Sequence, residues 1–388
     1  MNLSKYTLAA ALGMGGVGAA SAQTVYVTGS TALQSQFVSA VQTPGVVFSA
    51  VPLETTWTPN GSTYMAFTGT GTAAVNGGFP LMILCSWSES EAGIQDVTSW
   101  NVTEQFPNGP YPGGAQAGAA TTFSHSVDLA MADNDTTCSR AFAVSQPTPN
   151  PITHKAKVGV VAFKWVRNPG LWTGTNVAGP AIRQALNCGV YRSVFSGNCG
   201  DTNDYVYVAG CDNSSGTRVN AFGIINYGIF TVPGQIEIAA GNMVNVGGLY
   251  CGDFGQSGGG ALAASMTAST VSSMDRINGG VGFSAIAYLG ASDAQTAIQG
   301  GAVECSYNGV RFSPCAIEQG AYTFWGNEYL MENNDVIFPV ATQVFAALSA
   351  PTGINSQIAT PPASNVTAIR LSDMQCFRYG PTSDPAHY

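Results

Sequence analysis

Two short turns, rich in hydroxyl groups and backbone amides, are the residues in this sequence best suited to chemistry. One is Gly29-Ser30-Thr31-Ala32, after the apolar run 24–27, and the other is Ser215-Gly216-Thr217, after the apolar run 205–209. Each precedes a segment expected to be helical. The first N–H groups of a helix lack internal partners and carry the positive end of its dipole, so each turn can hold sulfate, phosphate or carboxylate. Together they predict one anion clamp.

The same residue types also suit a purely structural role. Ser, Thr and Gly are preferred helix N-caps, so either turn alone is better explained as a cap. The occurrence of two such turns favours the anion site, and both interpretations stay open.

The N-terminus predicts export. Residues 1–22 contain a charged Lys5, an apolar run at 8–17 and Ala20-Ser21-Ala22 before Gln23, which is typical of a cleaved secretory signal. No cysteine follows the cleavage site directly, and no later apolar run approaches the roughly 18 to 20 residues of a membrane span. We expect a periplasmic or extracellular protein without membrane insertion.

The charge balance argues against nucleic-acid binding. The chain has 22 Asp and Glu against 13 Lys and Arg, and no basic stripe that could displace counterions from a phosphate backbone. The overall field is also unfavourable for a small anion. Local dipoles and hydrogen bonds must therefore hold any bound anion.

Nine cysteines in an exported chain predict disulfides. Their spacing suggests two short-loop pairs and two longer alternatives, with one thiol left over: Cys188 with Cys199, Cys305 with Cys315, Cys211 with Cys251, and Cys85 with Cys138. No Cys-x-x-Cys motif occurs and the three histidines are scattered, so no metal site is expected.

Short apolar runs alternate with helical patterns, which predicts an α/β fold. Strands are expected at 24–27, 47–51, 81–85, 126–132, 157–166, 205–209, 279–288 and 322–329, a helix at 181–195, and a loop or irregular hairpin at 55–78. The length exceeds what one core usually supports, and alternate prolines at 147–151 predict a stiff connector between two domains.

The order of these segments resembles the phosphate-binding proteins of bacterial ABC transporters, within the type II periplasmic binding fold. The resemblance rests on several short motifs in the same order: Gly29–Ala32, Trp87–Ile94, Val127–Asp133, Gly189–Asn198, Ser215–Thr217, Gly280–Phe283 and Ala321–Phe324. It implies two α/β lobes with a ligand cleft between them. Residues 23–150 would form the first part of lobe 1, residues 151–310 lobe 2, and residues 311–388 the return to lobe 1.

By position, the resemblance implies a set of ligand-binding residues: Thr31, Ala32, Ser90, Asp133, Ser215, Gly216 and Thr217, with Ser88 as an alternative to Ser90. Asp133 would accept the proton of hydrogen phosphate. Sulfate has no such proton, so an unpaired buried carboxylate would discriminate against it. A solvated turn or a helix cap remains an alternative role for Asp133.

This sequence departs from the family's pattern at Cys211. An Arg usually stands there, four residues before the Ser of the Ser-Gly-Thr turn, and a thiol cannot replace its bidentate bonds. Arg218 beside the turn is either a substitute cation or a solvent-facing helix residue. Glu89 and Glu91 add negative charge that a phosphate site would not favour.

The resemblance implies an exported, non-catalytic solute-binding protein that holds a small oxyanion, phosphate above others, needs no cofactor and serves an ABC permease. An alternative is a secreted or surface structural or adhesive protein with a degenerate form of this fold that has lost the transport ligand. Low charge, Gly/Thr-rich loops and Cys211 favour that alternative.

An enzyme is not expected. Residues 255–259 match the Gly-x-Ser-x-Gly pattern of a nucleophile elbow, but neither a strand before them nor a helix directly after them is expected. No histidine lies near the anion loops to act as a base.

Overall fold

The computed structural model describes residues 22–57, 63–99, 103–108, 122–140, 152, 154–169, 172, 174–202, 204–267, 274–275, 281–282, 284–333, 339–359 and 367–387. Residues 1–21 of the expected export signal and the proline connector at 147–151 lie outside them.

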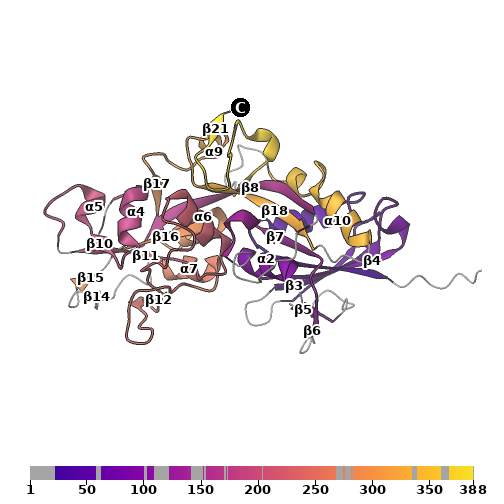
Figure 1. Cartoon of the computed structure of the whole chain (residues 1–388), viewed down its shortest axis with the longest axis horizontal. Coiled ribbons are helices and arrows are strands. Elements are labelled where there is room, and N and C mark those ends of the chain that lie inside the picture. Colours follow the sequence, from indigo (N-terminus) through magenta and orange to yellow (C-terminus); the bar gives the residue numbers. More distant parts are fainter. Residues whose placement is uncertain are drawn as a thin grey trace, which may run out of the picture.

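A single mixed sheet runs through the whole molecule (Figure 1). In spatial order its strands are β10 (Val190–Tyr191), β11 (Tyr205–Ala209), β16 (Ser284–Gly290), β8 (His154–Arg167), β18 (Trp325–Glu332), β7 (Leu129–Ala132), β1 (Gln23–Gly29), β4 (Pro80–Trp87), β3 (Thr63–Thr70) and β2 (Leu53–Trp57). Three more join it off this path: β9 (Asn176–Val177), β17 (Val303–Tyr307) and β19 (Ala368–Ile369).

The remaining strands of the described residues form small two-stranded sheets: β5 (Glu104–Pro107) with β6 (Thr122–His125), β12 (Ile238–Ala239) with β13 (Asn242–Met243), β14 (Met274–Asp275) with β15 (Val281–Gly282), and β20 (Cys376–Phe377) with β21 (Ala386–His387).

Helices pack on both halves of the large sheet: α1 (Gln34–Gln42), α2 (Ser90–Thr98), α4 (Gly179–Ala185), α5 (Ser193–Ser196), α6 (Gly216–Ile224), α7 (Gly259–Ser265), α8 (Ala291–Gln299), α9 (Pro314–Glu318) and α10 (Pro339–Ser349). Short 3-10 turns are η1 (Asn76–Gly78), η2 (Thr136–Cys138), η4 (Ile354–Gln357) and η5 (Leu371–Asp373). Figure 1 shows α4–α7 at one end of the molecule and α2 and α10 toward the other, with β8 and β18 between them.

The register of the central strands β8 and β18 brings together the two halves of the large sheet, which are β10–β11–β16 on one side and β7–β1–β4–β3–β2 on the other. β8 runs antiparallel to both β18 and β16, and β18 runs antiparallel to β7. The carboxyl end of β7 therefore lies level with Lys157 of β8, because Ala132 and Lys157 both pair with Tyr329. The end of β16, at Gly290, lies level with Phe163. Strand β7 of one half and strand β16 of the other thus run toward each other and end on either side of the middle of β8.

The core is continuous across this junction. The central strands place large aromatic side chains next to one another, and Trp165 stacks on Phe324 with ring centroids 5.4 Å apart. Trp165 and Phe324 are fully buried, and both belong to a hydrophobic cluster that includes residues from both halves. Because aromatic side chains contribute a large share of core energetics, this contact stabilises the packing of β8 beside the start of β18.

Most expected strands are present, but two expectations about local structure are wrong. Residues 47–51 form bends and irregular backbone with one isolated bridge, Phe48 to Gly71, in place of a strand. The helix expected at 181–195 is broken into α4, a turn, β10 and α5. Cys188 and Gly189 have φ angles of 64° and 82°. A Cβ at position 189 would lie 2.4 Å from the Tyr207 ring, so the helix ends where the chain passes over β11. The 55–78 region contains the β2–β3 pairing of a hairpin.

The disulfide pairing inferred from spacing is also wrong. Cys188 is bonded to Cys251, 63 residues away, and the other seven cysteines are free thiols. The pairing follows from tertiary contacts, since Asn187 bridges to Gly234 and Gln235 bridges to Gly252. Segment 234–235 thus brings Cys188 and Cys251 together. Cys85, Cys211 and Cys305 are instead buried in the core.

The end of β1 depends on glycine. Gly29 has φ 107°, and a Cβ there would lie 2.0 Å from the Met131 carbonyl oxygen. We predict that Gly29→Ala destabilises the protein by about 1 to 3 kcal/mol more than Gly45→Ala, because overpacking against backbone adds to backbone strain. Gly45 is the matched control, with φ 87° and no atom within 4 Å of its Cβ position. Urea unfolding of both variants tests this, and equal losses would contradict it.

Candidate functional site

A cavity of about 760 Å³ lies where the strands of the two halves end facing each other. Its walls come from the loops β1–α1, β4–α2, β11–α6 and β16–α8, from Asp133 after β7, and from residues 257–261. Val161 and Phe163 of β8 also line it. Ligands of open α/β sheets bind outside the carboxyl ends of strands, so this is the expected place for a site.

All the residues inferred from the sequence as ligand-binding line this cavity: Thr31, Ala32, Ser90, Asp133, Ser215, Gly216 and Thr217, together with the alternative Ser88. They come from both halves of the sheet. The fold therefore brings the predicted set together, while their role as ligand contacts stays a prediction.

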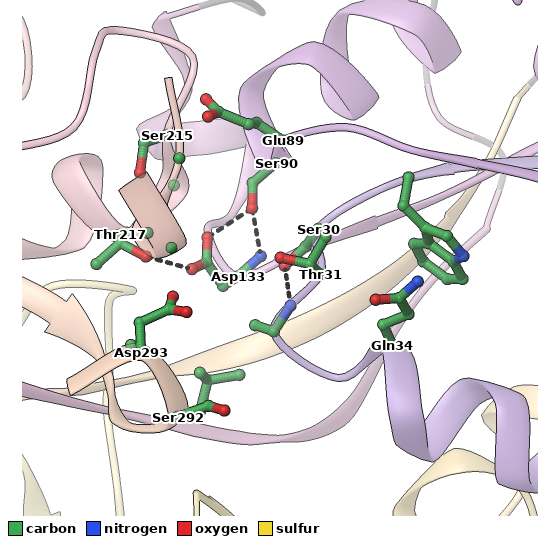
Figure 2. Close-up of a pocket in the computed structure, with 18 of the residues that line it drawn as sticks. Ser30, Thr31, Gln34, Glu89, Ser90, Asp133, Ser215, Thr217, Ser292 and Asp293 are labelled. Carbon is green, nitrogen blue, oxygen red and sulfur yellow. Dashed lines mark hydrogen bonds between the residues drawn. The ribbon is translucent and has the colours of Figure 1, made fainter. Parts of the chain in front are cut away.

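Asp133 is the centre of the contacts between the halves (Figure 2). It is only 3% exposed, which contradicts a solvated turn. The Ser90 hydroxyl donates to Oδ1 at 2.7 Å, and the Thr217 hydroxyl donates to Oδ2 at 3.2 Å. The Asn220 amide donates to the Asp133 carbonyl oxygen at 2.6 Å. Thr217 and Asn220 belong to α6, so one residue at the end of β7 receives hydrogen bonds from the opposite half.

The close approach of α6 to Asp133 requires glycine at position 216. A Cβ there would lie 1.7 Å from Asp133 Oδ1 and 2.6 Å from Ser90 Cβ. Beside it, Ser215 caps α6, and its Oγ accepts from the Arg218 N–H at 3.4 Å. The capping interpretation thus holds for Ser215, although the same residue lines the cavity. In the first turn, the Ala32 N–H donates to Ser30 Oγ at 3.1 Å.

A second contact between the halves involves Ser214. The Glu91 N–H donates to the Ser214 carbonyl oxygen at 3.0 Å. The Ser214 hydroxyl contacts carboxyl oxygens of both Glu89 and Asp212. One hydroxyl proton cannot satisfy two carboxylates. Burial raises the pKa of Glu89 to about 7. The hydrogen bond from Ser214 opposes this shift, and the nearby acidic groups Asp212 and Asp133 add to it.

The cavity wall is acidic. Glu89, Asp133 and Asp293 line it, and no Lys or Arg is found among its described lining residues. Arg218 is 2% exposed and its guanidinium bonds to Asp253, so it neither faces solvent nor lines the cavity. Cys211 is a buried free thiol. An anion here would be held by N–H and O–H donors alone.

Burial shifts the acidic groups of the site toward their neutral forms. Desolvation raises the pKa of Asp133 to about 6, against the opposing effect of hydrogen bonds from Ser90 and Thr217. Glu328 of β18 is fully buried, and desolvation followed by the nearby Asp133 charge raises its pKa well above the usual range. Sequence reasoning missed Glu328, because a lone Glu in an aromatic strand gives no local sign of burial.

Asp293 was also missed. It lies in the first turn of α8, directly after β16, and lines the cavity. The rule that ligands gather at the carboxyl ends of parallel strands would have found it, once the strand expected at 279–288 was seen to end at Gly290.

The Gly-x-Ser-x-Gly segment does not form a nucleophile elbow. Ser257 lines the cavity, and α7 starts at Gly259, so the expectation that no helix follows directly was wrong. No strand leads into residue 257 in the described chain, and His125, His154 and His387 lie outside the cavity lining. Ser257 therefore has no histidine beside it among the described lining residues.

Within the described ranges, no cluster of three or more His, Cys, Asp or Glu is placed to bind a metal ion. No helix in the same part of the chain is both long and apolar enough to cross a bilayer.

Comparison with solved structures places this geometry in a known fold. A protein from Clostridium perfringens, assigned as a phosphate ABC transporter substrate-binding protein and solved with bound phosphate, superposes with a TM-score of 0.50. The two chains are 10% identical, and the alignment covers 90% of this chain and 100% of the other. The fold is that of the type II periplasmic binding proteins. Two lobes with a cleft between them are its defining feature, as the sequence resemblance implied.

Two further solved structures, with lower TM-scores, are also named as phosphate-binding or phosphate-transport proteins. An ABC-type phosphate transport receptor from Vibrio cholerae is 10% identical, with 87% and 97% of the two chains covered and a TM-score of 0.43. The periplasmic phosphate-binding protein PfluDING, solved with phosphate, is 13% identical, with 90% and 91% covered and a TM-score of 0.43. No protein-family model matches the chain, and no curated protein matches it in sequence.

The raised pKa of Asp133 predicts a pH-dependent stability. Between its unfolded pKa, near 4, and its folded pKa of about 6, the folded state binds more protons, so stability falls as pH rises through this window. Relative to Asp133→Asn, the wild type should lose roughly 2 kcal/mol of unfolding free energy between pH 4 and pH 7. Chemical unfolding of both proteins at several pH values measures this. A difference that is constant with pH would show that Asp133 titrates normally.

Proposed function

We propose that this protein is a non-catalytic solute-binding protein that holds a small oxyanion, phosphate above other inorganic anions, between its two lobes. The observation that carries the proposal is the convergence of Thr31, Ser90, Asp133 and the Ser215–Thr217 turn on one cavity from both halves. Structural neighbours of the same fold are named as phosphate-binding proteins, which supports the same solute class.

The hydrogen bonds of Asp133 specify which oxyanion fits. Ser90 and Thr217 already donate their hydroxyl protons to this buried carboxyl. An anion that accepts the hydrogen bond of either hydroxyl group leaves one oxygen of Asp133 without a donor. Only a ligand that carries a proton of its own can donate a hydrogen bond to that oxygen in exchange. Hydrogen phosphate carries one and sulfate does not, so an unsatisfied buried carboxylate would count against sulfate.

Export through residues 1–22 and delivery to a membrane permease are part of the same proposal. The structural or adhesive alternative is not favoured. A protein that had lost its ligand would have no need to keep hydroxyl-rich loops from both halves aligned around an open cavity.

Titration of the mature protein with phosphate, arsenate and sulfate tests the function. We expect phosphate and arsenate to stabilise it, by about 2.7 kcal/mol at 100 times the dissociation constant, and sulfate to do so far less. Calorimetry and thermal unfolding are the measurements. Absence of stabilisation by any of the three anions would overturn the proposal of an inorganic ligand.

A glycine substitution tests the site itself. Gly216→Ala should reduce oxyanion affinity at least tenfold, because its Cβ would displace Asp133 from the position in which it joins the lobes. Gly380→Ala is the control, since the nearest atom to its Cβ position is Ser383 Cβ at 4.0 Å. Equal affinities of the two variants would place the anion elsewhere.

A further inference from the structure

The cavity is larger than an inorganic oxyanion requires. Its volume of about 760 Å³ falls in the range of pockets that enclose organic ligands, about 300 to 1,000 Å³. Thr217 and Asp133 meet in one region, whereas Gln34 lies apart from them beside the first helix (Figure 2). Trp87 and Phe163 add aromatic surface to the lining. A solute with an organic body would use space that phosphate leaves empty.

Asp293 presents a partly exposed carboxylate to this space. In Figure 2 its side chain points from the start of α8 toward Thr217 and Asp133. Among the described residues, no hydrogen bond or ion pair satisfies it. Gly259 leaves room for it, because a Cβ there would lie 2.0 Å from Asp293 Oδ2. A carboxylate only accepts hydrogen bonds, so a donor on the solute is its natural partner.

Glu89 adds a second acceptor from the opposite lobe. Its Oε1 is buried without a hydrogen-bond partner and lies 3.8 Å from the Cβ position of Gly258, next to the glycine that contacts Asp293. The two carboxyl groups thus flank the 258–259 peptide. Because no Lys or Arg is present in the described lining, a positive charge on the solute would be favoured beside these carboxyl groups.

We propose that the solute is a small organic zwitterion, with its oxyanion at the Ser215–Thr217 turn and its ammonium group at Asp293. The start of α6 favours the anion through its N–H groups and dipole, and the carboxylate of Asp293 accepts from the ammonium group. This inference rests on the proposed oxyanion-binding function and deepens it by naming the class of solute.

A matched pair of ligands tests the proposal. 2-Aminoethyl phosphate and ethyl phosphate share the phosphate head and differ in the ammonium group, and inorganic phosphate is the third probe. For the wild type we expect 2-aminoethyl phosphate to bind at least about tenfold more tightly than ethyl phosphate, as expected for a charge-assisted hydrogen bond in a partly buried site. Calorimetric titration of the full mature chain measures all three.

Variants assign the effect to Asp293. In Asp293→Asn the advantage of 2-aminoethyl phosphate should disappear, while ethyl phosphate should gain affinity because a negative charge is removed. Asp373→Asn, the same chemical change on η5 outside the cavity, should leave the preference unchanged. Thermal unfolding of each variant without ligand verifies that it is folded.

The outcomes separate the two proposals. If phosphate and ethyl phosphate bind as tightly as 2-aminoethyl phosphate, the zwitterion proposal is wrong and the oxyanion function stands. If no phosphate compound binds, the oxyanion function fails, and the zwitterion proposal fails with it. A preference that persists in Asp293→Asn would also overturn the role given to this residue.

Discussion

The contact between Asp133 and the start of α6 is the constraint on which the site depends. A buried carboxyl at the end of β7 accepts hydrogen bonds from Ser90 in its own lobe and from Thr217 in the other. Gly216 permits the approach, since any side chain there would overlap Asp133. Hydrogen bonds to a carboxyl group in a low-dielectric interior are strong, and breaking one leaves an unsatisfied group. The relative position of the lobes and the protonation of Asp133 are therefore linked.

This link shapes the electrostatics of the cavity. Its acidic groups are not balanced by a described Lys or Arg in the lining, and burial raises the pKa of both Asp133 and Glu89. In the proposed site, helix N-termini and hydroxyl groups would attract an anion, while the carboxyl groups would accept hydrogen bonds from donors on the solute. Such a site would distinguish solutes by the positions of their hydrogen-bond donors more than by their net charge. The replacement of an Arg by Cys211 fits this arrangement, since a fixed cation is absent from its expected place.

The large sheet provides the rigidity that such selection needs. β8 and β18 run through the middle of the molecule and pair along most of their lengths. The stacked Trp165 and Phe324 rings fill the core beside the cleft. Residues on strand ends and helix starts are held more precisely than residues on long loops. Asp133, directly after β7, and Asp293, in the first turn of α8, occupy such positions.

The sequence by itself determined the local elements and the chemistry of the loops. Apolar runs predicted β11 and β4 closely, and the Ser-Gly-Thr turn marked the start of α6, because periodicity and capping depend on neighbours in the chain. The resemblance then supplied the set of cavity residues. Only the tertiary structure decided the Cys188–Cys251 pairing, the break after α4, the burial of Arg218 and Glu328, and the exposure of Asp293 to the cavity. Each of these depends on contacts between residues far apart in the chain, which no local pattern encodes.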